Sequence, residues 1–147
     1  MMPGVRVRRL ASNADLPLPS RQTAGSAGYD VASAEPFFEL APGERRSVST
    51  GLAFEVAAGY EMQVRPRSGL AMRSGILVAN APGTVDSDYR GELKVILLNA
   101  GSAPVGIARG DRIAQLVFAR YETPTIEEAE TLAASARGDG GFGSTGR

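Results

Sequence analysis

The feature that most restricts the fold is a period-two alternation of apolar side chains between residues 48 and 64. A half-buried strand shows this period, because its successive side chains point to opposite faces. The alternation is interrupted once, by Ala57-Ala58-Gly59, which indicates a turn. We therefore predict two strands joined as a hairpin. The alternating side chains are Val48, Thr50, Leu52, Phe54 and Val56, then Tyr60, Met62 and Val64.

Further strands are predicted on both sides of this hairpin. Short apolar runs at residues 76–78, 93–98 and 113–118 fit buried strands, and Val5 and Val7 alternate with arginines. The chain also has 18 glycines and 9 prolines in 147 residues, which separate these segments every few positions. This pattern favours an all-β fold of the sandwich or barrel-like kind in one domain.

Only two segments have a helical pattern. Residues 68–73 fit one or two turns after Pro66, and residues 125–135 begin with Thr125 and Glu128 at capping-box spacing. An isolated helix as short as the second is marginal in water, so we expect an extended linker there. The glycine-rich end has too few apolar residues to pack a core. We expect a β domain over residues 1–121 and a linker with a flexible arm over 122–147.

The composition excludes several kinds of chemistry. The chain has no cysteine and no histidine, which rules out disulfides, thiol nucleophiles, Ser-His-Asp triads and histidine zinc sites. The available bases are carboxylates, Lys94, tyrosines and bound water. A formal net charge of zero gives no general attraction to nucleic acid or to a membrane, and no apolar run approaches membrane-spanning length. We expect a cytoplasmic protein with neither partner.

The segment from residue 83 to residue 92, Gly-Thr-Val-Asp-Ser-Asp-Tyr-Arg-Gly-Glu, gathers reactive side chains into a glycine-bounded turn. Asp86 is suited to hold and polarise a water, and Tyr89 to pack its ring against a sugar. Asn80, just upstream, offers a donor and an acceptor to one edge of a base. The structural alternative is a β-turn with solvated aspartates, and we assign Asp88 to that alternative.

Two other segments supply polar groups. Arg67, Ser68 and Gly69 offer a guanidinium, a hydroxyl and a close backbone approach to a phosphate, where a helix start would add free N–H groups. The alternative is a strand-to-helix turn with a serine cap. Gln115 is a polar residue inside an apolar strand, so it needs a partner. It either orients a water or phosphate oxygen or forms a structural hydrogen bond across the sheet.

The C-terminal segment combines glycines with a few donors and one aromatic ring. Arg137, Ser144, Thr145 and the glycine amides, including that of Gly143, are able to wrap a terminal phosphate. Phe142 stands isolated among glycines, and a base face is an obvious partner for its ring. The alternative is a disordered glycine-rich end.

Taken together with residues 27–31, Ala-Gly-Tyr-Asp-Val, these segments make the chain resemble the trimeric dUTP pyrophosphatases (dUTPases). Five family motifs occur in order, at residues 27–31, 66–71, 83–92, 110–117 and 137–146. The resemblance implies a jelly-roll-like β-clip fold with one short helix, and a homotrimer with shared active sites. It also implies Mg²⁺-dependent hydrolysis of dUTP to dUMP and pyrophosphate. That reaction removes dUTP from the DNA precursor pool and supplies dUMP for thymidylate synthesis.

The resemblance also assigns roles to individual residues. Asp86 would activate the attacking water, Gln115 would hold the water network, and Asp30 would touch Mg²⁺ through water. Tyr89 would stack on deoxyribose and exclude a ribose 2′-hydroxyl. The groups expected to read uracil are Asn80 and the backbone near Thr84, Val85 and Lys94.

The remaining roles concern the triphosphate and the arm. The α and β phosphates would be bound by Arg67, Ser68 and Gly69. The arm would close over the substrate, with its binding residues being Arg137, Phe142, Gly143, Ser144 and Thr145. An extended chain from residue 122 to 142 reaches on the order of 60–70 Å, enough to cross to a neighbouring subunit. Ser74-Gly75 departs from the family, which often has histidine-glycine there, and we expect this to affect packing only.

Two rival functions remain. A dCTP deaminase-like enzyme of the same superfamily shares the fold and the phosphate-binding serine, but does not normally end in such an arm. A non-catalytic nucleotide sensor or protein-interaction module could keep the pocket and lose the base, yet Asp86 is present. Ammonia release from dCTP separates the first rival from a dUTPase, and turnover separates the second.

Overall fold

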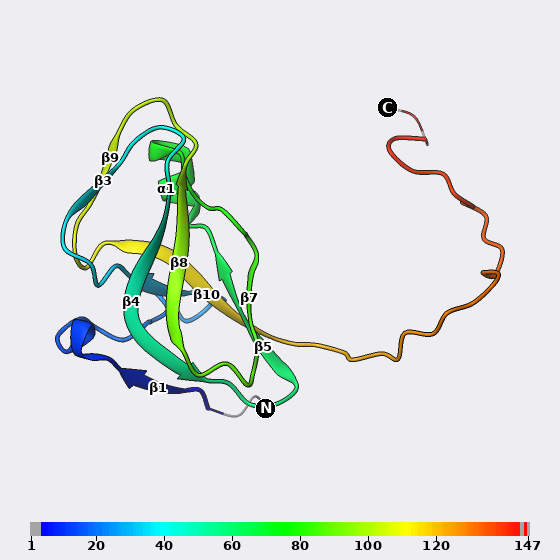
Figure 1. The fold of residues 1–147 in the computed structure, drawn as a ribbon, viewed down its shortest axis with the longest axis horizontal. Helices are drawn as coiled ribbons and strands as arrows, with labels where there is room; N and C mark the ends of the chain where they lie inside the picture. The colour runs from blue at the N-terminus through cyan, green and yellow to red at the C-terminus, as the bar shows by residue number, and fades with distance from the viewer. Residues whose placement is uncertain (1–3, 145, 147) are drawn as a thin grey trace.

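The computed structural model describes residues 4–144 and residue 146. It contains three antiparallel β-sheets and one short α-helix (Figure 1). The strand orders are β1-β4-β8-β6, β2-β10-β5-β7 and β3-β9. The elements are β1 (Arg6–Arg9), the 3-10 helix η1 (Ala11–Asn13), β2 (Tyr29–Ala32), β3 (Phe38–Leu40), β4 (Arg45–Glu55), β5 (Tyr60–Arg65), α1 (Ser68–Ser74), β6 (Ile76–Val78), β7 (Gly83–Val85), β8 (Glu92–Asn99), β9 (Val105–Ile107) and β10 (Arg112–Arg120).

One hydrophobic core joins the two larger sheets. Leu52 of β4 and Leu97 of β8 come from the first sheet, and Met62 of β5 and Leu116 of β10 come from the second, all at most 1% exposed. The apolar runs at residues 76–78, 93–98 and 113–118 lie in β6, β8 and β10, as predicted. The all-β fold class with one short α-helix is therefore confirmed.

The predicted hairpin between residues 48 and 64 is wrong in its pairing, although both strands exist. β4 pairs with β1 and β8, whereas β5 pairs with β10 and β7. The turn before Tyr60, whose N–H donates to the Ala57 carbonyl at 3.1 Å, carries the chain from one sheet to the other. A period of two shows which face of a strand is buried, but both sheets bury a face in the same core.

β4 is distorted at Gly51, where its register with β8 shifts between Ser49 and Ala53. Gly51 has a φ of 64°, and a Cβ at this position would lie 2.5 Å from the Cβ of Asn13. The 3-10 helix η1 lies against this distortion. The buried Asn13 donates from Nδ2 to the Thr50 carbonyl at 2.6 Å, and Thr50 Oγ1 donates to the Leu93 carbonyl at 2.6 Å. The start of β8 is thus fixed against this bulge of β4.

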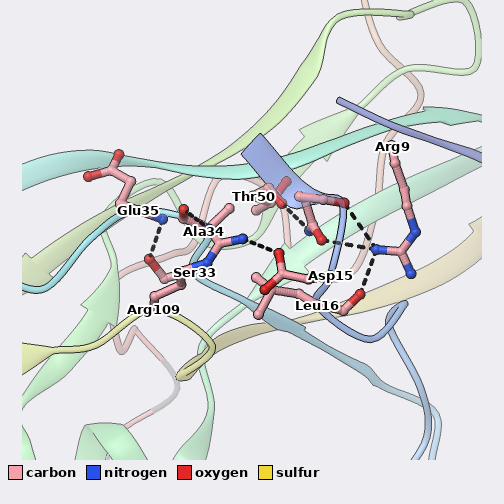
Figure 2. Close-up of polar contacts among 9 residues, drawn as sticks. Arg9, Asp15, Leu16, Ser33, Ala34, Glu35, Thr50 and Arg109 are labelled. Atoms are coloured by element: carbon pink, nitrogen blue, oxygen red, sulfur yellow. Dashed lines mark hydrogen bonds and ion pairs between the residues drawn. The ribbon is translucent and has the colours of Figure 1, made fainter. Parts of the chain in front are cut away.

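Arginines tie the loop after η1 to neighbouring segments (Figure 2). Arg9 donates to Asn13 Oδ1 at 3.0 Å and to the Leu16 carbonyl at 2.5 Å. Arg109 donates to Asp15 Oδ1 at 2.5 Å and also to the Ala34 carbonyl. The hydrogen bond from Arg109 is the main reason that the pKa of the Asp15 carboxyl lies below its ordinary value.

The chain beyond β10 leaves the β sheets and runs away from them (Figure 1). Residues 125–135 form no helix, although Thr125 and Glu128 have capping-box spacing. Ile126 and Leu132 are 95% and 89% exposed. In the part of the chain that the structure describes, no helix is long and apolar enough to cross a membrane.

Candidate active site

The segment expected to bind phosphates lies between β5 and α1. β5 ends at Arg65, Arg67 is the N-cap residue with extended backbone, and α1 begins at Ser68, as predicted. The helix ends at Gly75 in a left-handed conformation with a φ of 68°. A Cβ on Gly75 would lie 2.5 Å from the Gly101 nitrogen, so this position requires glycine.

A concavity of about 370 Å³ opens beside this segment. It brings together five residues that the sequence singled out in three separate motifs, namely Asp30, Arg67, Ser68, Gly69 and Gln115. Strand pairing explains why these residues lie together, because Gln115 of β10 lies between Asp30 of β2 and Arg65 of β5 in the same sheet. The predicted phosphate-binding groups thus share one surface.

Asp30 lies between two arginines. Its carboxylate, only 12% exposed, has Oδ1 3.4 Å from Arg67 Nε and Oδ2 2.9 Å from Arg112 Nη1. Arg67 also donates from Nη1 to the Arg112 carbonyl at 3.1 Å. These contacts fix the Arg67 guanidinium at the concavity, where it faces the region expected to hold phosphate oxygens.

The donor set suits a magnesium ion that is held mainly by a substrate. Among the residues with described positions, no group of three or more Asp, Glu, His or Cys side chains could hold a metal. Mg²⁺ keeps several waters and takes its remaining ligands from one or two carboxylates and substrate phosphates. Asp30 is a single carboxylate at the concavity where phosphates are expected, so the residues present fit such an ion.

Gln115 forms the structural hydrogen bond that was one of its two alternatives. Its Nε2 donates to the Pro66 carbonyl at 2.9 Å, which ties β10 to the segment before α1. Its Oε1 lies over Gly28, where a Cβ would come within 2.2 Å of that oxygen. Gly28 therefore leaves the space that the Gln115 amide occupies.

The segment over residues 83–92 forms a second concavity, of about 560 Å³. β7 ends at Val85, so Asp86 is the first residue after the strand, and it is exposed to solvent. The lining includes the predicted residues Thr84, Val85, Asp86, Tyr89 and Lys94. This concavity offers a solvent-accessible carboxylate beside an aromatic ring.

Tyr89 is held by its own turn. Its N–H donates to the Asp86 carbonyl at 3.1 Å, and its hydroxyl donates to the Glu92 carbonyl at 3.0 Å. A Cβ on Gly91 would lie 2.4 Å from the hydroxyl oxygen, so the ring crosses the space that glycine leaves. The side chain is still 48% exposed, which leaves part of the ring available to a ligand.

The two concavities share no lining residue. Within one chain, Asp86 therefore lines a different concavity from Arg67 and Gln115. Asn80 is exposed on the turn before β7 and lines neither concavity, although its amide nitrogen lies 3.2 Å from the Cβ position of Gly83.

The arm residues are not brought to either concavity. Arg137 donates from Nε to the Gly140 carbonyl at 2.6 Å, and Ser144 donates from its N–H to the Gly141 carbonyl at 3.0 Å. Phe142 is fully exposed with a φ of 51°, and Gly143 follows with a φ of 84°. Thr145 lies outside the described residues. The hydrogen bonds of residues 137–144 and 146 in the arm thus form local turns.

Sequence reasoning missed an ion-pair partner of Asp30 and residues that line the second concavity. Arg112 reaches Asp30 across 82 positions of sequence, and no local pattern signals such a pair. Ser47 of β4 lines the second concavity. It was missed for the same reason, because no local pattern signals its position there. Glu92 had a signal, because it closes the segment that contains Asp86 and Tyr89.

Comparisons with known proteins agree on one family. A family model described as dUTPase matches residues 14–146. A curated deoxyuridine 5′-triphosphate nucleotidohydrolase from Anaeromyxobacter sp. (strain Fw109-5) is 57% identical over 144 residues, covering 97% of this chain and 97% of the relative. One of the same name from Methylocella silvestris is 52% identical over 145 residues, covering 97% of this chain and 91% of the relative.

Solved structures give the same result. The dUTPase of Staphylococcus bacteriophage 80alpha with dUPNHPP is 27% identical and has a TM-score of 0.89, with 98% of this chain and 99% of that chain covered. A mutant dUTPase from phage phi11 of S. aureus, whose structure concerns the coordination of a structural Mg(II) ion, is 25% identical with a TM-score of 0.79. There 90% of this chain and 100% of that chain are covered.

Proposed function

The chain belongs to the dUTPase family and is an enzyme that hydrolyses dUTP. We propose that Asp86 activates a water for in-line attack on the α-phosphorus of dUTP. The observation that carries the proposal is the exposed Asp86 carboxylate beside the Tyr89 ring in one concavity. Attack at the α-phosphorus breaks its bond to the bridging oxygen, which leaves with pyrophosphate, while the water oxygen remains on dUMP. The water proton passes to Asp86.

Tyr89 and the strand ends around it select the nucleoside in this proposal. The Tyr89 ring packs on deoxyribose, where an added 2′-hydroxyl has no space. Asn80 and the backbone of Thr84, Val85 and Lys94 bind uracil edges. The 560 Å³ concavity that most of these residues line supports this assignment.

The other concavity binds the α and β phosphates. Arg67 carries the positive charge, and Ser68 and Gly69 add a hydroxyl and a backbone approach. Gln115 keeps the segment before α1 in place through Pro66, and its free oxygen is available to the water network. Asp30 is the residue that would hold Mg²⁺ through water. When bound, that ion neutralises charge on the triphosphate oxygens.

A homotrimer completes the site in this proposal. The two concavities lie apart in one chain and share no lining residue, so subunits that face each other join one concavity of each kind. The arm then covers the nucleotide, with Phe142 on uracil and Arg137, Gly143, Ser144 and Thr145 at the γ-phosphate. A cytoplasmic location and the supply of dUMP for thymidylate synthesis belong to the same proposal.

Asp86→Asn tests the proposed base. The amide keeps the size of the side chain but cannot accept the water proton, so kcat for dUTP should fall by about two to four orders of magnitude while dUTP binding persists. Calorimetry gives the binding and pyrophosphate release gives kcat. The matched control is Asp88→Asn, which removes a carboxylate two positions along the same turn and should leave kcat unchanged. Full activity in Asp86→Asn would refute the assignment.

A further inference from the structure

Glu92, the first residue of β8, lines the 560 Å³ concavity and also contacts the bulge of β4. Its carboxylate Oε1 accepts the Gly51 N–H at 3.0 Å, and its backbone carbonyl accepts the Tyr89 hydroxyl at 3.0 Å. Its Oε2 lies 4.0 Å from Lys94 Nζ. We propose that Glu92 is a positioning residue that sets the Tyr89 ring by fixing the start of β8 on the Gly51 amide. The inference rests on the proposed sugar-reading role of Tyr89.

The Gly51 end of this connection is rigid. Gly51 and Thr50 are both buried, and Thr50 is fixed by hydrogen bonds on both sides, from Asn13 and to Leu93. The left-handed backbone of Gly51 aims its N–H away from the regular ladder, in the stretch where the β4–β8 register shifts. Glu92 supplies the acceptor for this buried N–H, which needs one.

The Tyr89 end is less constrained by packing. The ring is 48% exposed, so its position depends on hydrogen bonds more than on neighbouring side chains. The hydroxyl has one acceptor among the contacts of the described residues, the Glu92 carbonyl. A shift of the Glu92 backbone therefore moves the acceptor that holds the ring. The Glu92 side chain thus affects the position of the Tyr89 ring through the Gly51 amide and its own backbone carbonyl.

Three substitutions of Glu92 distinguish the effect of its side-chain length from the effect of its charge. Glu92→Gln keeps an oxygen at the same distance from the backbone and loses the charge, whereas Glu92→Asp keeps the charge and is one methylene shorter. Positioning through Gly51 predicts that Glu92→Gln stays close to wild type. It predicts that Glu92→Asp and Glu92→Ala raise KM for dUTP about tenfold and lower the preference for dUTP over UTP about tenfold. Changes in kcat for dUTP should stay below about threefold, because no hydrogen bond or ion pair among the described residues joins Glu92 to Asp86.

The measurement is steady-state kinetics on dUTP and UTP for the full-length chain and the three variants. Glu39→Ala is the control, since it removes an exposed carboxylate from β3, outside both concavities. Exchange of the Gly51 amide hydrogen gives a second readout. It should speed up in Glu92→Asp and remain slow in Glu92→Gln. If Glu92→Ala fails to fold, the order of the Gln and Asp variants still decides.

The opposite order, with Glu92→Asp near wild type and Glu92→Gln impaired, would show that charge matters and would overturn the inference. The inference would also be overturned if all three variants matched wild type, or if they lowered kcat and left KM and selectivity unchanged. A wild-type chain with no preference for dUTP over UTP would overturn the proposed reading of the sugar, and this inference with it. A selective wild type with insensitive variants would overturn the inference alone.

Discussion

Gly28 is important for the space that it leaves rather than for any contact of its own. The Gln115 amide fills that space, and from there it holds Pro66 beside Arg67. The effect of a residue without a side chain thus extends to the proposed phosphate site. Sequence reasoning placed Gly28 in a motif but gave no reason for glycine there, because the reason is a side chain 87 positions away in sequence (115 − 28).

Gly28→Ala should therefore affect activity more than stability. A Cβ would lie 2.2 Å from Gln115 Oε1, and the flexible amide is able to swing away from Pro66. We expect a loss of about 1 kcal/mol in unfolding free energy, or about 2–4 °C in Tm, and about a tenfold fall in kcat/KM for dUTP. Calorimetry and pyrophosphate release measure the two effects.

Gly25→Ala is the matched control for this substitution. A Cβ on Gly25 meets nothing within 4 Å, so both stability and kcat/KM should stay at the wild-type values. If Gly28→Ala keeps full activity, the Gln115 amide has no role in the phosphate site.

Local sequence was sufficient to single out the residues proposed to act in the 560 Å³ concavity, but not the ion pair between Asp30 and Arg112. Asp86 and Tyr89 are three positions apart in sequence and line the same concavity, so residue type and spacing were enough to single them out. The contact of Asp30 with Arg112 depends instead on the register of β2 against β10, which is a property of the folded sheet.

At the scale of elements, alternation predicted strands well and partners poorly. β4 and β5 were recognised because several residues show the period of two, whereas β3, β7 and β9 have three residues each and are too short to show it. The pairing of β4 with β8 and of β5 with β10 brings together residues far apart in sequence. Turn chemistry at Gly59 shows that the chain reverses there, but not into which sheet it continues.

The ion pair between Asp15 and Arg109 should make the free energy of unfolding depend on pH in the acid range. The pKa of Asp15 is lowered by the Arg109 hydrogen bond, so the carboxylate contributes stability above its unfolded pKa, near 3.8, and loses it as pH falls through the folded pKa. Asp15→Asn should lower Tm at pH 7. The difference from wild type should narrow below pH 3.8 and vanish below the folded pKa.

Thermal unfolding scans from pH 7 down to the acid range measure this difference. Asp139→Asn, an exposed carboxylate in the arm, serves as the control and should match wild type at every pH. A difference for Asp15→Asn that stays constant through the acid range would mean that the side chain acts by something other than its charge.

Deletion of residues 137–147 should show that the arm contributes to activity and not to folding. The described hydrogen bonds of these residues are local, and the hydrophobic core lies wholly within the β strands and their neighbours. We expect an unchanged Tm and circular dichroism spectrum, with kcat/KM for dUTP lower by about two orders of magnitude. A truncated chain that fails to fold, or that keeps full activity, would contradict the proposed role of the arm.

At the scale of the whole molecule, the sequence motifs are collected into three separate places. The two concavities and the described part of the arm carry most of the predicted residues, although Asn80 lines neither concavity. None of the three places alone combines the predicted base, the predicted nucleoside-binding groups and the predicted phosphate-binding groups. This separation is the structural reason for proposing that the active site is shared between subunits. A single sequence lists the parts in order but does not give the contacts between copies.

The most direct test of this account is pyrophosphate release from dUTP, dTTP, dCTP and UTP in parallel, with Mg²⁺ and then with EDTA, and with ammonia release followed for dCTP. The account predicts fast release from dUTP alone, slowed by EDTA, because the concavity around Thr84 and Tyr89 selects uracil and deoxyribose. Equal release from UTP or dTTP would contradict the proposed selectivity. Ammonia from dCTP without pyrophosphate from dUTP would contradict the hydrolase itself.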